Sequence, residues 1–299
     1  MNHHDAIVWI KQAQDEGTND GISALYHAKR GIWHNSYPEV SGYIIPTLIA
    51  AGEEDRALRV SRWLITQQLA QGSIPLGFWD SKSAAVFDTG AVLLGWIAAQ
   101  EVEYDPSTEL AIEKAVYWLE RCWKGYRWTR VGTEASQPAT INVRAIWPLA
   151  LRDSPIVDEL LDYFLERIDP NGFPRMTDDQ FPDMPLSHFI VYVARGFFES
   201  GLIEPATRIM ENLPSVPVAR YNSNWEPVTD DICITGVAQA SIMFRKLGFR
   251  AEAQRGLNYL ETLTAPWGTD PIDGKYFPHC QLSWCAKFIA DAWKEADSH

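Results

Sequence analysis

One carboxyl group is distinguished by its apolar surroundings in the sequence. Asp88 interrupts an apolar run that extends from Ala84 to Leu93. Partial burial raises the pKa of a carboxyl group, and a raised pKa suits a general acid at neutral pH. Asp88 is also followed by Thr-Gly where a helix is expected to begin, which is typical of an N-cap. Both interpretations stay open for Asp88.

Two other acidic positions are candidates for the partner of Asp88. Asp230 and Asp231 are adjacent, and neighbouring carboxyl groups can divide into one that pairs and one that reacts. Glu39 stands at the start of another predicted helix. Hydrolysis of a glycosidic bond needs two carboxyl groups about 5 to 10 Å apart, depending on the mechanism. We predict that Asp88 is the acid and that Asp231 or Glu39 is its partner. A capping or first-turn role is the alternative for each.

Phenol, imidazole and guanidinium groups would support a different reaction. Elimination or epimerisation at a uronate needs a Tyr or His that takes the proton next to the carboxylate, and an Arg, Asn or His that neutralises that carboxylate. Tyr37 and His188 are therefore added to the candidate catalytic residues. The side chains expected to contact or position a substrate are Trp33, His34, Tyr43, Trp79, Asn142, Arg144, Trp225, Asp230, His279 and Gln281.

Composition and missing motifs argue against several classes of protein. The 299 residues carry a formal net charge of −13, which argues against nucleic acid or an anionic membrane surface as the main partner. The sequence has no HExxH or HxxxH spacing, no P-loop and no CxxC pair, so we expect neither a metal nor a cofactor. It also lacks an apolar run of roughly 20 residues and a signal segment, so we expect a cytoplasmic protein. The oligomeric state stays open.

The elements that position these residues repeat along the chain about every 48 residues. Six segments are apolar around most of a helical circumference, which is typical of helices buried on most sides. These segments are 38–51, 86–100, 139–151, 185–201, 230–247 and 278–293. Six others combine an apolar stripe with a charged face, which is typical of helices with one solvated side. These are 5–15, 54–69, 108–123, 156–168, 204–213 and 250–263.

The two kinds of helix alternate, and the loops between them differ. Long loops rich in Gly, Pro, Asp, Asn and aromatic residues precede the apolar helices, and short loops follow them. Helix pairs that cannot bury an inner helix alone can do so when they are arranged in a ring. We predict an all-α protein, an (α/α)6 toroid formed by a single domain over residues 1–299. The long loops and the candidate residues would then share one mouth. An open α-solenoid is the alternative.

The ends of the outer helices carry a pattern similar to the QW repeat of squalene cyclases and prenyltransferases. It is clearest at Trp63, Leu64 and Gln68, with Gly72 following. The whole chain resembles the α/α-toroid superfamily, which includes six-hairpin glycosidases, toroidal polysaccharide lyases and the squalene-cyclase repeats. Residues 37–43 and 87–90 are similar to toroid proteins of bacterial polysaccharide metabolism. The resemblance implies the toroid fold and leaves the activity open.

The residues and the resemblance together predict a carbohydrate-active enzyme for a bacterial poly- or oligosaccharide. Glycoside hydrolysis by two carboxylates at the mouth is the first interpretation. A polysaccharide lyase or uronate epimerase, a carbohydrate-binding toroid without activity, and a terpenoid-cyclase-like protein are the alternatives. The last departs from the acidic DxDD motif, because Val228 stands where the first Asp is required. The few Lys and Arg residues expected at the mouth argue mildly against a heavily anionic polymer.

Overall fold

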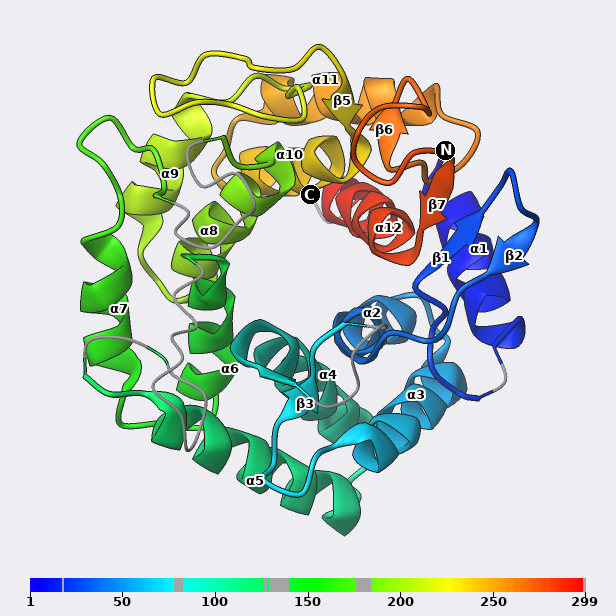
Figure 1. The fold of residues 1–299 in the computed structure, drawn as a ribbon, viewed down its shortest axis with the longest axis vertical. Coiled ribbons are helices and arrows are strands. Elements are labelled where there is room, and N and C mark those ends of the chain that lie inside the picture. The colour runs from blue at the N-terminus through cyan, green and yellow to red at the C-terminus, as the bar shows by residue number, and fades with distance from the viewer. Residues whose placement is uncertain (18, 78–82, 126–127, 129–139, 176–183, 298–299) are drawn as a thin grey trace.

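The helices form two concentric rings in the computed structural model, which describes residues 1–17, 19–77, 83–125, 128, 140–175 and 184–297 (Figure 1). The inner ring consists of α2 (Pro38–Ala50), α4 (Val86–Val102), η1 (Thr140–Ala145) continued by α6 (Ile146–Ala150), α8 (Ser187–Glu199), α10 (Ile234–Lys246) and α12 (Ser283–Asp297). The outer ring consists of α1 (His3–Asp15), α3 (Glu54–Gln67), α5 (Pro106–Cys122), α7 (Val157–Leu165), α9 (Ile203–Glu211) and α11 (Arg250–Glu261). The predicted all-α (α/α)6 toroid is confirmed.

The inner helices pack closely because small residues lie where they touch. A Cβ atom added to Gly42 of α2 would lie 2.6 Å from the Cα atom of Val92 in α4. At Gly90 of α4, an added Cβ atom would lie 2.6 Å from the Cβ atom of Ala145 in η1. Such distances are shorter than van der Waals contact, so larger side chains would force the helices apart. The small residues of the repeat therefore set the spacing of the inner ring.

The first and last repeats are joined, which closes the ring. Helix α12 packs against both α1 and α2. Strand β1 (Leu25–His27) pairs with β2 (Ile32–Trp33) on one side and with β7 (Cys280–Leu282) on the other. The amino group of Met1 donates to the carbonyl oxygen of Leu260 at 2.6 Å. The open solenoid is therefore wrong for this chain.

Short strands stand directly before three of the inner helices and shift two helix starts. The other strands are β3 (Ile74–Pro75) paired with β4 (Ala84–Ala85), and β5 (Ile232–Cys233) paired with β6 (Thr269–Asp270). Helix α10 begins only after β5, and α12 only after β7. The predicted starts at positions 230 and 278 are therefore too early. In the third repeat, Pro148 has no N–H to donate toward η1, and only the short α6 is α-helical.

None of the helices among the described residues is long and apolar enough to cross a membrane. The described residues also contain no group of three or more His, Cys, Asp or Glu side chains suited to a metal ion.

Candidate functional site

Asp88 lies in the first turn of α4 and is only 2% exposed. The N-cap position of this helix belongs to Ala85, so the N-cap interpretation of Asp88 is wrong. Its Oδ1 atom instead accepts a hydrogen bond from the backbone N–H of Gly77, at 3.1 Å. The phenol of Tyr37, which precedes α2, is also hydrogen-bonded to this carboxyl group. Burial raises the pKa of Asp88 to about 7, although these hydrogen bonds oppose the shift.

Glu39 is the second buried carboxyl group at this point, in the first turn of α2 and 4% exposed. Burial raises its pKa well above the ordinary value, and the charge of Asp88 raises it further. Tyr37 is hydrogen-bonded to Glu39 as well as to Asp88. Both carboxyl groups thus reach one phenol oxygen and lie close together. The two carboxyl groups therefore titrate as a pair, and close like charges favour a pair that holds one proton.

Cations from two other inner helices face this pair. The charges of Arg144 in η1 and Lys287 in α12 both act to lower the pKa of Glu39. Lys287 Nζ lies 2.5 Å from Asp291 Oδ2, and the hydroxyl of Thr47 donates to Asp291 Oδ1 at 2.7 Å. Burial lowers the pKa of Lys287 to about 8. Lys287 was not among the residues predicted from the sequence, although a lysine inside a largely apolar helix is a signal that could have identified it.

Aromatic rings connect the carboxyl pair with His188. Tyr192 of α8 is hydrogen-bonded to Tyr43 of α2, and its ring lies 4.9 Å from the guanidinium carbon of Arg144. The ring of His188 lies 4.5 Å from that of Tyr192. Burial lowers the pKa of His188 to about 3, and its Nδ1 lies 3.3 Å from Oε1 of Gln239. Burial raises the pKa values of Tyr43 and Tyr192. His188 is therefore a neutral side chain near pH 7.

The structure thus brings together six of the predicted residues, Tyr37, Glu39, Tyr43, Asp88, Arg144 and His188. Asn142 is buried in η1, two positions before Arg144. We use the name axial cluster for the six residues together with Tyr192 and Lys287. Tyr192 carried no signal in the sequence, because an aromatic residue inside a buried helix is typical of the core.

Four other predicted residues lie elsewhere, near the seam between the first and last repeats. The ring of Trp33 packs 5.1 Å from that of Trp9, and His34 follows it after β2. Gln281 lies in β7 and accepts a hydrogen bond from Trp9 Nε1 at 2.9 Å. His279 precedes that strand with a φ of 59°, and its backbone N–H donates to the carbonyl oxygen of Ile272 at 2.7 Å. His279 therefore does not begin an inner helix as predicted.

The adjacent carboxylates before α10 are also placed differently from the prediction. Asp230 is exposed, and Asp231 directly precedes β5, so neither lies at the start of a helix. The charge of Asp231 acts on the thiol of Cys233, and its Oδ2 atom would lie 2.8 Å from a Cβ atom added to Gly274. Asp231 is not among the groups that perturb Asp88 or Glu39. Of the two predicted partners of Asp88, the structure places Glu39 beside it.

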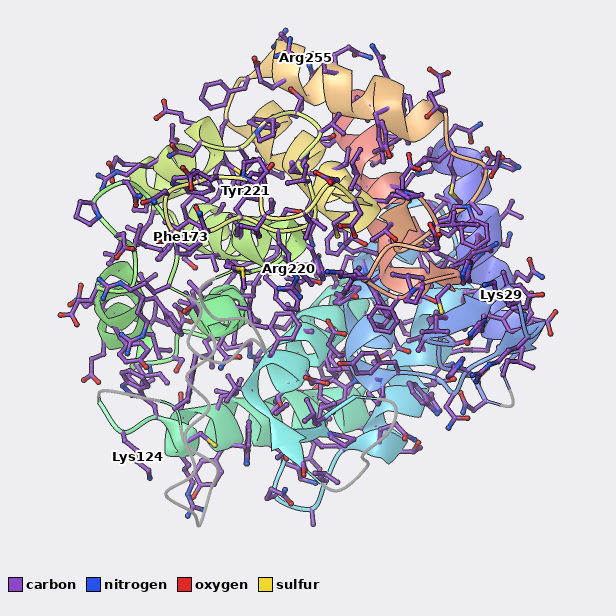
Figure 2. All side chains as sticks on the ribbon, turned by 45° about the horizontal axis from the view of Figure 1, so that its top comes forward. Lys29, Lys124, Phe173, Arg220, Tyr221 and Arg255 are labelled. Atoms are coloured by element: carbon purple, nitrogen blue, oxygen red, sulfur yellow. The ribbon has the colours of Figure 1, made fainter. Side chains whose placement is uncertain are left out.

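Trp225 occupies the loop that follows α9. Its ring packs 5.1 Å from that of Phe173 and 6.4 Å from that of Tyr221 (both labelled in Figure 2). Its Nε1 atom donates to the carbonyl oxygen of Asn171 at 3.1 Å. These contacts bind neighbouring loops together. The predicted substrate residue Trp79 lies outside the described residues.

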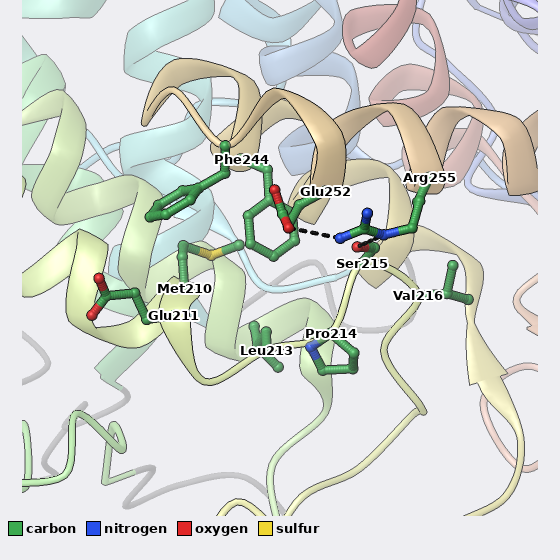
Figure 3. A pocket seen from close by; sticks show the side chains of 10 residues that line it. Met210, Glu211, Leu213, Pro214, Ser215, Val216, Phe244, Glu252 and Arg255 are labelled. Atoms are coloured by element: carbon green, nitrogen blue, oxygen red, sulfur yellow. Dashed lines mark hydrogen bonds and ion pairs between the residues drawn. The ribbon is translucent and has the colours of Figure 1, made fainter.

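A separate cavity of about 590 Å³ lies outside the inner ring, between α9 and α11 (Figure 3). Its wall includes Met210 and Phe244. Glu252 and Arg255 pair with each other at 2.6 Å, and Arg255 Nε also donates to the hydroxyl of Ser215 at 3.1 Å. Because these charged groups satisfy each other, the axial cluster is the better candidate for chemistry.

Comparison with known proteins finds the fold of this chain among solved structures. Neither a protein-family model nor a curated protein sequence matches the chain. Among solved structures it is similar to an alpha-amylase from Clostridium perfringens, with a TM-score of 0.75 and 11% identity over 99% of this chain and 98% of the other. It is also similar to an unsaturated glucuronyl hydrolase specific for heparin, with a TM-score of 0.72 and 12% identity over 98% of this chain and 95% of the other. A third similar structure is the cellobiose 2-epimerase of Bacillus thermoamylovorans, with a TM-score of 0.73 and 10% identity over 97% of this chain and 98% of the other. The predicted resemblance to six-hairpin glycosidase-like α/α toroids is confirmed at the level of fold.

Proposed function

We propose that the protein is a glycoside hydrolase for a bacterial poly- or oligosaccharide, with Asp88 as the general acid and Glu39 as its partner. The observation that carries the proposal is the buried carboxyl pair joined through Tyr37. A pKa of about 7 keeps Asp88 partly protonated near neutral pH, as a general acid requires. Arg144 and Lys287 face Glu39, and their positive charges oppose the rise in its pKa. The alpha-amylase and the glucuronyl hydrolase of the same fold support a hydrolytic reaction.

The proposed reaction moves one proton and one electron pair at the bond that breaks. Asp88 gives its proton to the glycosidic oxygen, which leaves with the electrons of the bond to the anomeric carbon. Glu39 stabilises the positive charge that develops on the sugar and attacks the anomeric carbon. Water then hydrolyses the glycosyl ester, and Asp88 recovers its proton from that water. This retaining course requires the two carboxyl groups to lie about 5 to 5.5 Å apart.

The burial of the pair also bears on where a substrate is cut. Asp88 and Glu39 are 2% and 4% exposed, and both stand among the inner helices. An interior bond of a long polymer could not easily reach carboxyl groups that are buried among the inner helices. We propose that the enzyme removes a terminal residue or cleaves a short oligosaccharide.

A uronate epimerase or lyase is the second candidate, and a specific cluster favours it. Arg144, Tyr192 and His188 lie in contact, and Tyr37 and Tyr43 adjoin them. We rank it second because its bases are poorly matched to neutral pH. Burial lowers the pKa of His188 to about 3 and raises those of the tyrosines. A terpenoid-cyclase-like role would need an apolar cavity, and several charged groups of the axial cluster argue against it.

Product analysis on a panel of bacterial polysaccharides and oligosaccharides tests the proposal. Wild type is compared with Asp88→Asn and Glu39→Gln by mass spectrometry, a reducing-end assay and ultraviolet absorbance. New reducing ends without an unsaturated product, lost in both variants, would support hydrolysis. Ultraviolet absorbance from an unsaturated uronate would indicate a lyase. Unchanged mass with a changed proton spectrum would indicate an epimerase. Binding without any product would favour a carbohydrate-binding protein.

Substrates with activated leaving groups distinguish the role of Asp88 as general acid from the role of Glu39 as its partner. An activated leaving group departs without protonation, so Asp88→Asn should retain much of its activity on an aryl glycoside of the right sugar. Glu39→Gln should lose activity on both kinds of substrate. The reverse result would exchange the two roles within the same pair.

A further inference from the structure

Arg144 shares its carboxylate partner, Glu199, with Arg195. Arg195 Nε lies 2.5 Å from Glu199 Oε1, and Lys287 Nζ lies at the same distance from Asp291 Oδ2. Arg144 Nη2 lies 3.9 Å from Glu199 Oε2, which is beyond hydrogen-bond distance. Its Nε and Nη1 atoms are buried and have no hydrogen-bond partner among the residues that the structure describes. The Arg144 side chain is only 9% exposed, so water does not readily replace the missing acceptor.

A buried guanidinium with unpaired donors is unfavourable in the free protein. Burial of an N–H group without an acceptor destabilises a fold, and more so when the group is charged. Burial lowers the pKa of Arg144, which reflects the same imbalance. The side chain is nevertheless held in position, because its guanidinium carbon lies 4.9 Å from the ring of Tyr192. Such a group is ready to receive an anionic ligand.

The position of Arg144 relates this anion site to the carboxyl pair. Its charge acts on Glu39 and His188, and Arg144 also interacts electrostatically with Tyr43, so an anion bound by Arg144 would lie near the carboxyl pair. We propose that Arg144 binds the carboxylate of an acidic sugar, so that the substrate contains a uronic acid at the bond to be cleaved. This inference rests on the proposed hydrolytic function.

A carboxylate suits this site better than a phosphate group. One guanidinium with free donors matches a planar anion of single charge. A phosphate would bring up to two negative charges next to Glu39. Few Lys and Arg residues were expected at the mouth, because only the loops and the helix starts were considered. Two cations nevertheless face the carboxyl pair. Arg144 and Lys287 project from the inner elements η1 and α12 rather than from the loops.

The test compares oligosaccharides that differ only at the carboxyl group. Oligosaccharides of glucuronate, galacturonate and mannuronate are measured beside their carboxyl-reduced forms by titration calorimetry. The Asp88→Asn variant is used so that turnover does not interfere. We expect at least one native uronate to bind roughly 10- to 100-fold more tightly than its reduced form. Adding Arg144→Met should remove this preference, whereas adding Arg59→Met on the surface of α3 should keep it.

Two results would overturn the proposal. One is equal binding of native and reduced forms, or no binding of any uronate in the panel. The other is an unchanged preference in the Arg144→Met protein. If Arg144→Met fails to fold, the native and reduced pair measured on the unaltered Arg144 protein still decides the matter. Failure of the hydrolytic proposal would be recognised separately, because wild type would then release no new reducing ends from the uronates that it binds.

Discussion

Replacement of Asp88 by asparagine should stabilise the protein, and the gain should grow as the pH rises. The raised pKa of Asp88 means that the folded protein holds a proton that the unfolded chain releases more easily. Below the ordinary value of 3.8, both states are protonated and burial of the carboxyl group carries no charge penalty. Between 3.8 and about 7, the unfolded chain loses its proton first, so the free energy of unfolding falls with rising pH.

The size of the effect follows from the two pKa values. The difference between 3.8 and about 7, at 1.36 kcal/mol for each pKa unit, corresponds to about 4 kcal/mol. Because Asp88 is 2% exposed, solvent screening reduces this figure little. Asparagine cannot ionise, so the variant does not lose this free energy of unfolding as the pH rises. Relative to wild type, Asp88→Asn should therefore gain about 4 kcal/mol in free energy of unfolding from about pH 4 to about pH 8.

Urea denaturation across this pH range measures the effect. The quantity to follow is the difference in free energy of unfolding between variant and wild type, because effects common to both proteins cancel. Asp55→Asn on the exposed surface of α3 is the matched control, and its difference should vary by less than about 0.5 kcal/mol. A difference for Asp88→Asn that is independent of pH would refute the reasoning. A variant that loses stability with rising pH would show that the fold favours the charged carboxylate.

Two further predictions concern neighbouring residues. Tyr37→Phe removes a hydrogen bond that lowers the pKa of Asp88. The falling limb of the pH–rate profile should therefore move to higher pH. A limb at the same pH as in wild type would mean that Tyr37 does not act on Asp88. Gly42→Ala places a Cβ atom 2.6 Å from the Cα atom of Val92 and should lower the free energy of unfolding by about 1–3 kcal/mol. Unchanged denaturation of this variant would contradict the close packing of α2 against α4.

The toroid was predictable because its signal repeats along the chain. Each inner helix is buried on most sides and each outer helix on one side, and both properties leave a periodic pattern in the sequence. The short strands left no such pattern. Two or three residues are too few to show an alternation, so the starts of α10 and α12 were placed too early. The single domain over residues 1–299 stays a prediction.

The candidate site was predictable where polar residues begin an inner helix. Asp88, Glu39 and His188 all lie in first turns, which the sequence marks by the change from loop to apolar helix. Tyr192 and Lys287 lie further along their helices. Which face of an inner helix meets the axis depends on the rotation of that helix in the ring, and local sequence does not determine it. This is also why the partner of Asp88 could not be chosen between Glu39 and Asp231.

The most direct test of the central claim is the fate of oxygen from water. A sensitive oligosaccharide is digested in water enriched in oxygen-18, and the products are weighed by mass spectrometry. Hydrolysis through Asp88 and Glu39 predicts one labelled oxygen at the new reducing end with wild type, and no cleavage product with Asp88→Asn. Cleavage to an unlabelled, unsaturated product, or a changed sugar configuration without cleavage, would contradict the account.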